Sequence, residues 1–186
     1  EVRQQLNPPP RPGRWVGFRL AEYLLRQHNI HLPKTGLDEA KSPAWMRMGF
    51  TLYRRLENLG YRSYPASESG LQWLEVYPHA CFCGMLGVIP FPKNTLEGRI
   101  QRQLILYDNK LRVPDPMELF EEITRHRILQ GILPLKDLYT PGELDALVAA
   151  YTAWMAGNHP ERLTILGHPD EGQIFLPVPE LKRSYS

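Results

Sequence analysis

The spacing of apolar residues along the chain predicts two helices in its first third. From Trp15 to about Asn29 a set of residues recurs at helical spacing: Phe18, Ala21, Leu24, Leu25 and His28. A second helix is predicted from about Pro43 to Leu59, where Gly60 is a natural stop. One stripe of this helix is apolar and consists of Trp45, Met48, Leu52, Leu56 and Leu59. Residues 79–86 and 95–110 are predicted as two further helices.

Capping boxes predict the start of two later helices. Asp115 is followed three positions later by Glu118, and the helix that they open is expected to close at Gly131. Thr140 and Glu143 form the same pattern with Pro141 between them, which predicts a helix that runs to about Ala156.

Short β-type segments separate these helices. Residues 61–64 (YRSY) and 71–77 (LQWLEVY) are predicted strands, and the second is apolar on both faces, as in a strand buried within a sheet. Residues 163–167 (LTILG) and 172–177 (GQIFLP) are two more, separated by a turn at His168, Pro169 and Asp170. Strands that alternate with helices predict a layered α/β domain.

The chain organisation predicted from these elements is a proline-rich arm over residues 1–14 and a single α/β domain over 15–186. Pro8, Pro9 and Pro10 exclude a helix in the arm and favour extended geometry. The predicted helices are too numerous for about four short strands to pack against, and no strand is predicted before the proline-rich arm. We therefore expect an N-terminal part of the sheet to be missing, so that a partner chain or an upstream segment completes it.

Composition is that of an ordinary globular protein. Hydrophobic residues make up 42% and charged residues 23% of the 186 positions, which excludes wholesale disorder. No apolar run reaches 18 residues, so no membrane span is expected. Two cysteines cannot form a disulfide framework, which favours a reducing, cytoplasmic setting.

Charge is distributed unevenly along the chain. Residues 1–62 contain eleven Lys and Arg against five acidic residues, whereas the remainder is net acidic. A basic lobe and an acidic lobe are compatible with a polyanionic substrate and an acidic pocket that collects metal ions. On composition alone, an ordinary solvated surface is the favoured interpretation.

Glu75 is the most informative candidate residue. It is the only charged residue between Gly70 and His79, and it lies near the end of an apolar strand. An ionised carboxylate in such a place is costly unless it is paired or coordinates a metal ion. Metal coordination and a structural salt bridge to a buried arginine are equally compatible with the sequence.

Asp145 is the second candidate carboxylate. The first turn of its helix favours acidic residues through the helix dipole, which is the simplest interpretation. Thr140 and Glu143 already serve that helix end, however, and small residues (Ala146, Ala149, Ala150 and Ala153) surround the Asp145 position. Asp145 is therefore a candidate to face the sheet rather than water.

Two other groups are weaker candidates. His79, Cys81 and Cys83 have the wrong spacing for a zinc knuckle and no second ligand pair, so buried thiols are expected instead. Lys93, Arg99 and Arg102 form a basic group that could contact phosphate, although an ordinary charged helix surface is the default interpretation.

Five segments follow one another along the chain in a recognisable order: GFRLAEYLLRQHNI, LEVYPHA, LEGRIQRQL, ELDALVAAYTAW and GHPDEGQIFLP. In this order they resemble a family of uncharacterised bacterial and archaeal proteins described as predicted nucleases of ribonuclease H-like fold. The resemblance begins at about Arg14. It implies a mixed sheet with helices on both faces and an acidic cluster that binds Mg²⁺ or Mn²⁺.

The resemblance also implies roles for particular residues. Glu75 matches the strand carboxylate and Asp145 the helix carboxylate, both as catalytic metal ligands. Arg19 and Glu22 match a helix motif that borders the site, and Lys93 would steer phosphate together with Arg19. A first-strand Asp and a second strand Asp have no counterpart, so the chain resembles the C-terminal two-thirds of such a domain.

Two hypotheses about function follow. The first is a two-metal nuclease that hydrolyses phosphodiester bonds, for which Glu75 and Asp145, 70 positions apart, must approach within roughly 8 Å. The second is a non-catalytic nucleic-acid-binding or scaffold module that keeps the fold with an incomplete acidic site.

Overall fold

The structure, a computed structural model, describes residues 5–36, 39–67 and 70–186. The first four residues of the predicted arm lie outside the described residues. Contacts divide the chain into two compact units. Unit 1 consists of Glu1–Val76 and Thr164–Phe175, and unit 2 of Tyr77–Leu163 and Leu176–Ser186. The prediction of a single domain over 15–186 stays a prediction.

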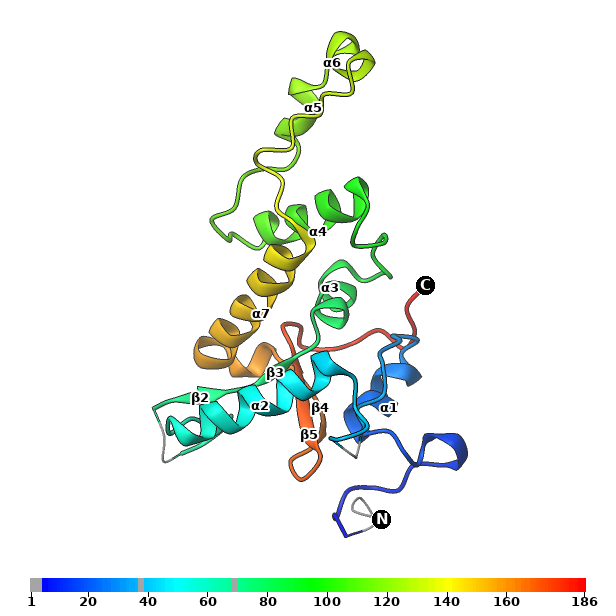
Figure 1. The fold of residues 1–186 in the computed structure, drawn as a ribbon, viewed down its shortest axis with the longest axis vertical. Helices are drawn as coiled ribbons and strands as arrows, with labels where there is room; N and C mark the ends of the chain where they lie inside the picture. The colour runs from blue at the N-terminus through cyan, green and yellow to red at the C-terminus, as the bar shows by residue number, and fades with distance from the viewer. Residues whose placement is uncertain (1–4, 37–38, 68–69) are drawn as a thin grey trace. The chain divides into compact units, whose positions relative to one another are not determined.

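Unit 1 combines two helices with short strands from both ends of the chain (Figure 1). Its elements are a 3₁₀ turn at Gly13–Trp15, α1 (Leu20–Gln27), α2 (Ala44–Asn58), β1 (Arg62–Ser63), β2 (Gln72–Trp73), β3 (Glu75–Val76), β4 (Thr164–His168) and β5 (Gly172–Leu176). β1 and β2 pair in parallel, and β3, β5 and β4 form a second sheet in that order. β3 is parallel to β5, whereas the short connection between β4 and β5 makes them an antiparallel hairpin.

Unit 2 is helical. Its elements are α3 (Pro78–Leu86), α4 (Leu96–Asp108), α5 (Glu118–Glu122), α6 (Arg125–Leu129), α7 (Pro141–Asn158) and a 3₁₀ turn at Pro160–Arg162. α3 and α4 both pack against α7, and each of the three helices has a fully buried side chain: Phe82, Leu106 and Val148. The amide of buried Gln103 on α4 bonds three backbone groups and so fixes the segment that leads into α7.

Most predicted helices are confirmed within one turn. The predicted helices over 43–59, 79–86 and 95–110 correspond to α2, α3 and α4. The capping box at α7 forms as expected, since the Thr140 hydroxyl accepts from the Glu143 N–H while the Glu143 carboxylate accepts from the Thr140 N–H. The helix predicted from Trp15 is shorter, because α1 begins at Leu20.

Two element predictions are wrong. The run 71–77 is not one buried strand: it changes partners at Leu74, so that β2 joins β1 and β3 joins β5, and both are only half buried. The helix predicted to open at the Asp115 capping box and to close at Gly131 is two short helices. Ile123 is extended between them, and the Thr124 hydroxyl caps α6 by accepting from the Arg127 N–H.

The apolar stripe of α2 is mostly exposed. Trp45, Met48, Leu52 and Leu59 are each more than half exposed, and Met46, outside the predicted stripe, is the buried residue of this helix. Helical spacing thus located the helix correctly but did not identify the side chain that it buries.

The fold class is mixed α/β, with seven α-helices and two small sheets over the residues that the structure describes. The ribonuclease H-like arrangement is a finer expectation that stays a prediction. Within 5–36, 39–67 and 70–186, no helix combines the length and the apolar character needed to cross a bilayer.

Candidate functional site

Arg19 is the centre of an ion-pair network in unit 1. It immediately precedes α1, and its Nε donates to Glu22 Oε1 at 2.9 Å. Its Nη1 and Nη2 donate to Glu75 Oε2 and Oε1, both at 2.6 Å. This fork-to-fork geometry is the strongest form of an arginine–carboxylate pair. Arg19, Glu22 and Glu75, which the family resemblance assigns to one site, are therefore in direct contact, and their predicted roles stay predictions.

Glu22 is completely buried, yet its charge is compensated. Oε2 accepts from the Arg19 backbone N–H, while Oε1 accepts from Arg19 Nε and from the Thr35 N–H. Burial by itself would lower the pKa of the Arg19 guanidinium, but its hydrogen bonds and charge interactions with Glu75 and Glu22 raise that pKa above its usual value. Arg19 is therefore a fixed cation, held from one side by Glu22.

Glu75 reaches the same place from the sheet. It lies on β3 directly opposite Ile174 of β5, and its side chain is 26% exposed. Of the two interpretations that the sequence left open for Glu75, the salt bridge to a buried arginine is the one present in the structure. The metal-binding role predicted for Glu75 stays a prediction.

Arg19 and Glu75 both line a pocket of about 600 Å³ that lies entirely within unit 1. Its lining combines charged, polar and aromatic side chains: Arg19, Tyr53, Ser63, Tyr64, Pro65, Trp73, Glu75, Pro169, Glu171, Gly172, Gln173 and Phe175. This volume falls within the range of pockets that hold small molecules or parts of larger ligands. Burial raises the pKa of Tyr53 to about 12, and the nearby charge of Glu75 adds to that shift.

Sequence reasoning missed Glu171 and Gly172, which also line the pocket. The buried Glu171 carboxylate accepts from Arg11 Nη2 and from the Leu20 N–H at the start of α1. Gly172 has a φ of +91°, and a Cβ there would lie 3.0 Å from Arg19 Nη1. One signal in the sequence could have found them. Both residues lie at the turn predicted between the last two strands, and loops often carry binding residues.

The remaining predicted site residues belong to unit 2. Lys93 Nζ donates to Asp145 Oδ2 at 3.0 Å in a largely exposed pair. Arg99 donates to the carbonyl oxygens of Leu138 and Tyr139.

Arg102 is only 2% exposed, and its Nη1 donates to the carbonyl oxygens of Phe91 and Gly98. Arg99 and Arg102 thus hold backbone segments together. Their predicted contacts with phosphate stay predictions. To bind phosphate through the same N–H groups, each arginine would have to give up its hydrogen bonds to these carbonyl oxygens.

The two cysteines are buried in α3, as the sequence analysis expected. Burial raises the pKa of Cys81 to about 12 and that of Cys83 to about 11. His79 Nε2 lies 3.7 Å from Cys83 Sγ, but burial lowers the pKa of His79, so that neighbouring imidazole is not a strong source of positive charge.

Both native thiols are expected to be unreactive toward an aromatic disulfide reagent at pH 8, because the attacking species is the thiolate and both groups are buried. The aromatic thiolate released from the reagent should show no fast phase in buffer. In denaturant, it should amount to two equivalents per chain. A rapid equivalent in buffer would contradict this expectation.

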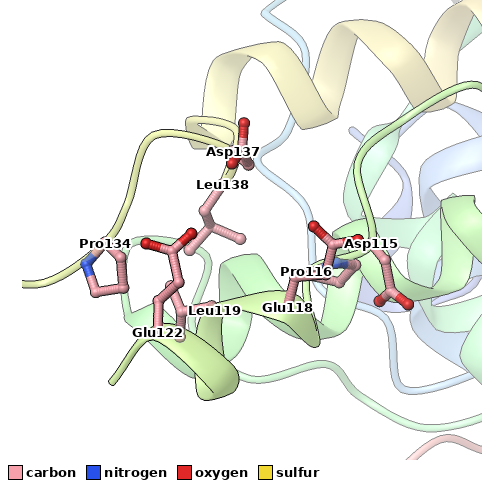
Figure 2. A pocket seen from close by; sticks show the side chains of 8 residues that line it. All are labelled: Asp115, Pro116, Glu118, Leu119, Glu122, Pro134, Asp137 and Leu138. Carbon is pink, nitrogen blue, oxygen red and sulfur yellow. The ribbon is translucent and has the colours of Figure 1, made fainter. Parts of the chain in front are cut away.

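An acidic pocket in unit 2 is a second place where carboxylates gather (Figure 2). Four acidic residues line it: Asp115, Glu118, Glu122 and Asp137. In Figure 2 the Asp115 carboxylate points away from the side chain of Leu138. The volume of the pocket is about 10 Å³, roughly room for one water molecule. Hydrogen bonds from Arg127 and Lys136 lower the pKa of Glu122, so part of this charge is already compensated.

Each of the two candidate metal-binding carboxylates has a cationic partner in this structure. Across 5–36, 39–67 and 70–186, no group of three or more His, Cys, Asp or Glu side chains is arranged to hold a metal ion. Arg19 occupies both carboxylate oxygens of Glu75, and Lys93 bonds one of Asp145. The predicted dependence on Mg²⁺ or Mn²⁺ stays a prediction, tested below by adding each ion.

These features define a mixed α/β protein with a charged and aromatic pocket in unit 1. Residues 24–171 match a family described as "Protein of unknown function (DUF429)", and the chain belongs to that family. A comparison with curated proteins gave no match, and neither did a comparison with solved structures.

Proposed function

We propose that this chain cleaves phosphodiester bonds in nucleic acid and binds the scissile phosphate in the Arg19–Glu75 pocket. The observation that supports this proposal is the fork of Arg19, whose Nη1 and Nη2 point at a carboxylate on the wall of a pocket of about 600 Å³. A phosphate, like a carboxylate, offers two oxygens that a guanidinium binds in a bidentate manner, so it can replace Glu75 on this fork.

The exchange would give each residue a distinct task. Glu22 keeps hold of Arg19 Nε, so the guanidinium stays in place when its other end changes partner. Glu75 then becomes a carboxylate next to a bound phosphate, where it can accept a proton from an attacking water molecule. The water oxygen bonds to phosphorus, the bond from phosphorus to the leaving sugar oxygen breaks, and solvent protonates that oxygen.

The test is cleavage of end-labelled DNA and RNA, single-stranded and duplex, in Mg²⁺, in Mn²⁺ and in a chelator. A Glu75→Gln variant is expected to cleave at least about 100-fold more slowly, because it keeps the shape of the side chain but cannot accept the proton. Glu39→Gln is the matched control, because Glu39 also accepts from both Nη atoms of an arginine, Arg54, but is exposed and outside the pocket.

Unchanged cleavage by Glu75→Gln would contradict the role of Glu75. Absence of cleavage in every condition, with retained binding of nucleic acid, would instead support a non-catalytic binding module. The complete engagement of Glu75 by Arg19 is the observation that favours this second candidate.

A further inference from the structure

We infer that the pocket of unit 1 accepts an unpaired nucleobase, so that the substrate is single-stranded or locally unpaired nucleic acid. This inference rests on the proposed function, because it places the phosphate of the same nucleotide on Arg19. It adds the part of the substrate that the rest of the pocket would recognise.

The pocket is larger and more aromatic than a phosphate requires. A site for phosphate alone needs the Arg19 fork, whereas this pocket of about 600 Å³ has four aromatic side chains in its wall: Tyr53, Tyr64, Trp73 and Phe175. Aromatic side chains beside a cationic group are the usual combination with which proteins bind unpaired nucleotides, because every base has a face that can stack.

The aromatic side chains form two pairs, each built from two different elements. Tyr53 on α2 lies against Trp73 on β2, with ring centroids 4.7 Å apart. Tyr64, which follows β1, meets Phe175 on β5 edge to face, with centroids 5.5 Å apart. Contacts with rings from other elements hold these rings in position, so less conformational entropy is lost when a ligand binds.

The indole N–H of Trp73 is a polar group close to these rings. Its indole Nε1 is buried and has no hydrogen-bond acceptor in the structure. A buried donor without an acceptor is costly, and because Trp73 itself lines the pocket, a shift of its ring on binding would let a ligand supply the missing partner. The carbonyl oxygens and ring nitrogens at the edges of nucleobases are acceptors of this kind.

A base can reach such a pocket only when it is not paired and stacked in a duplex. The faces of a base in a duplex are covered by its neighbours, and its pairing edge is bonded to the opposite strand. The aromatic pairs in the pocket wall therefore favour single strands, loops and frayed ends over continuous duplex.

The experiment measures binding in a chelator, by fluorescence anisotropy, with three DNA probes of one sequence. The probes are a single strand, the same strand with one central abasic position, and the duplex. The single strand is expected to bind most tightly. A Tyr53→Leu variant should weaken single-strand binding about 5- to 150-fold, which corresponds to the range measured for one base–aromatic stack.

Tyr107→Leu is the matched control, because Tyr107 is also a helical tyrosine but lies on α4, 40% exposed and outside the pocket. Circular dichroism verifies that each variant folds. A second measurement on the unmodified chain follows its indole N–H resonances. The Trp73 signal, assigned through a Trp73→Phe variant, should shift with the single strand and not with the duplex.

The outcomes separate this inference from the proposed function. Base-dependent binding without any cleavage would support the inference and overturn the proposed hydrolysis. Cleavage that requires Glu75 but proceeds equally well on duplex, with no effect of Tyr53→Leu, would overturn the inference alone. If no probe binds and none is cleaved, both fail.

Discussion

An Arg19→Ala variant should lose about 3–5 kcal/mol of its free energy of unfolding, a loss measured by urea denaturation at pH 7. The guanidinium compensates Glu22, which is completely buried, and also holds Glu75. Removal of one member of a buried ion pair leaves an uncompensated charge, which costs far more than the pair itself contributes.

Two comparisons distinguish this cause from a general loss of packing. Arg54→Ala removes an arginine from an exposed pair with Glu39 and should leave the denaturation midpoint nearly unchanged. Addition of Glu22→Gln to Arg19→Ala removes the stranded charge and should recover part of the lost stability. If the double variant is no more stable than Arg19→Ala, the buried charge is not the cause.

The second large effect is expected for Gly98→Ala in the first turn of α4. A Cβ at this position would lie 2.0 Å from the Pro92 carbonyl oxygen, a backbone atom that cannot rotate away. The helix start or the preceding loop must therefore move, which also disturbs the carbonyl bonds of Arg102. Overpacking of this kind costs about 1–3 kcal/mol, so thermal unfolding should begin several degrees lower.

Gly142→Ala is the control for this change. Gly142 also lies in the first turn of a helix, α7, but no atom lies within 4 Å of its added Cβ. Alanine is the better helix former, so this variant should be as stable as the unmodified chain or slightly more so. Equal losses at both positions would refute the steric argument for Gly98.

The helices were predictable where the sequence carries local signals. The Thr140 capping box located the start of α7, and Gly87, with its left-handed backbone, ends α3 close to the predicted residue. The strands were harder, because an apolar run such as 71–77 does not reveal that its partner changes at Leu74. That change depends on distant segments, β1 and β5, which local patterns do not encode.

The candidate site was only partly predictable, because its contacts join segments that lie far apart in the sequence. Glu75 stood out because a lone charge in an apolar strand requires a partner, and the sequence left open whether that partner is an arginine or a metal ion. The structure supplies Arg19, 56 positions away. Nothing local indicated that Glu171 would join Arg11 to the start of α1, since that contact spans 160 positions.

The pairing of β3 with β5 has a consequence for the order in which the chain acquires its shape during synthesis. Strand β5 is the central member of its sheet and follows β3 in the chain only after α3 to α7. While residues 5–76 emerge from the ribosome, Glu75 and Val76 have no strand to pair with, and Glu171 is not yet present to hold Arg11. The helices of unit 2 all lie in the one continuous stretch Tyr77–Leu163, so their mutual contacts span shorter separations in the sequence and are expected to form earlier. The pocket therefore cannot form before the segment 169–175, which supplies part of its wall, has been synthesised.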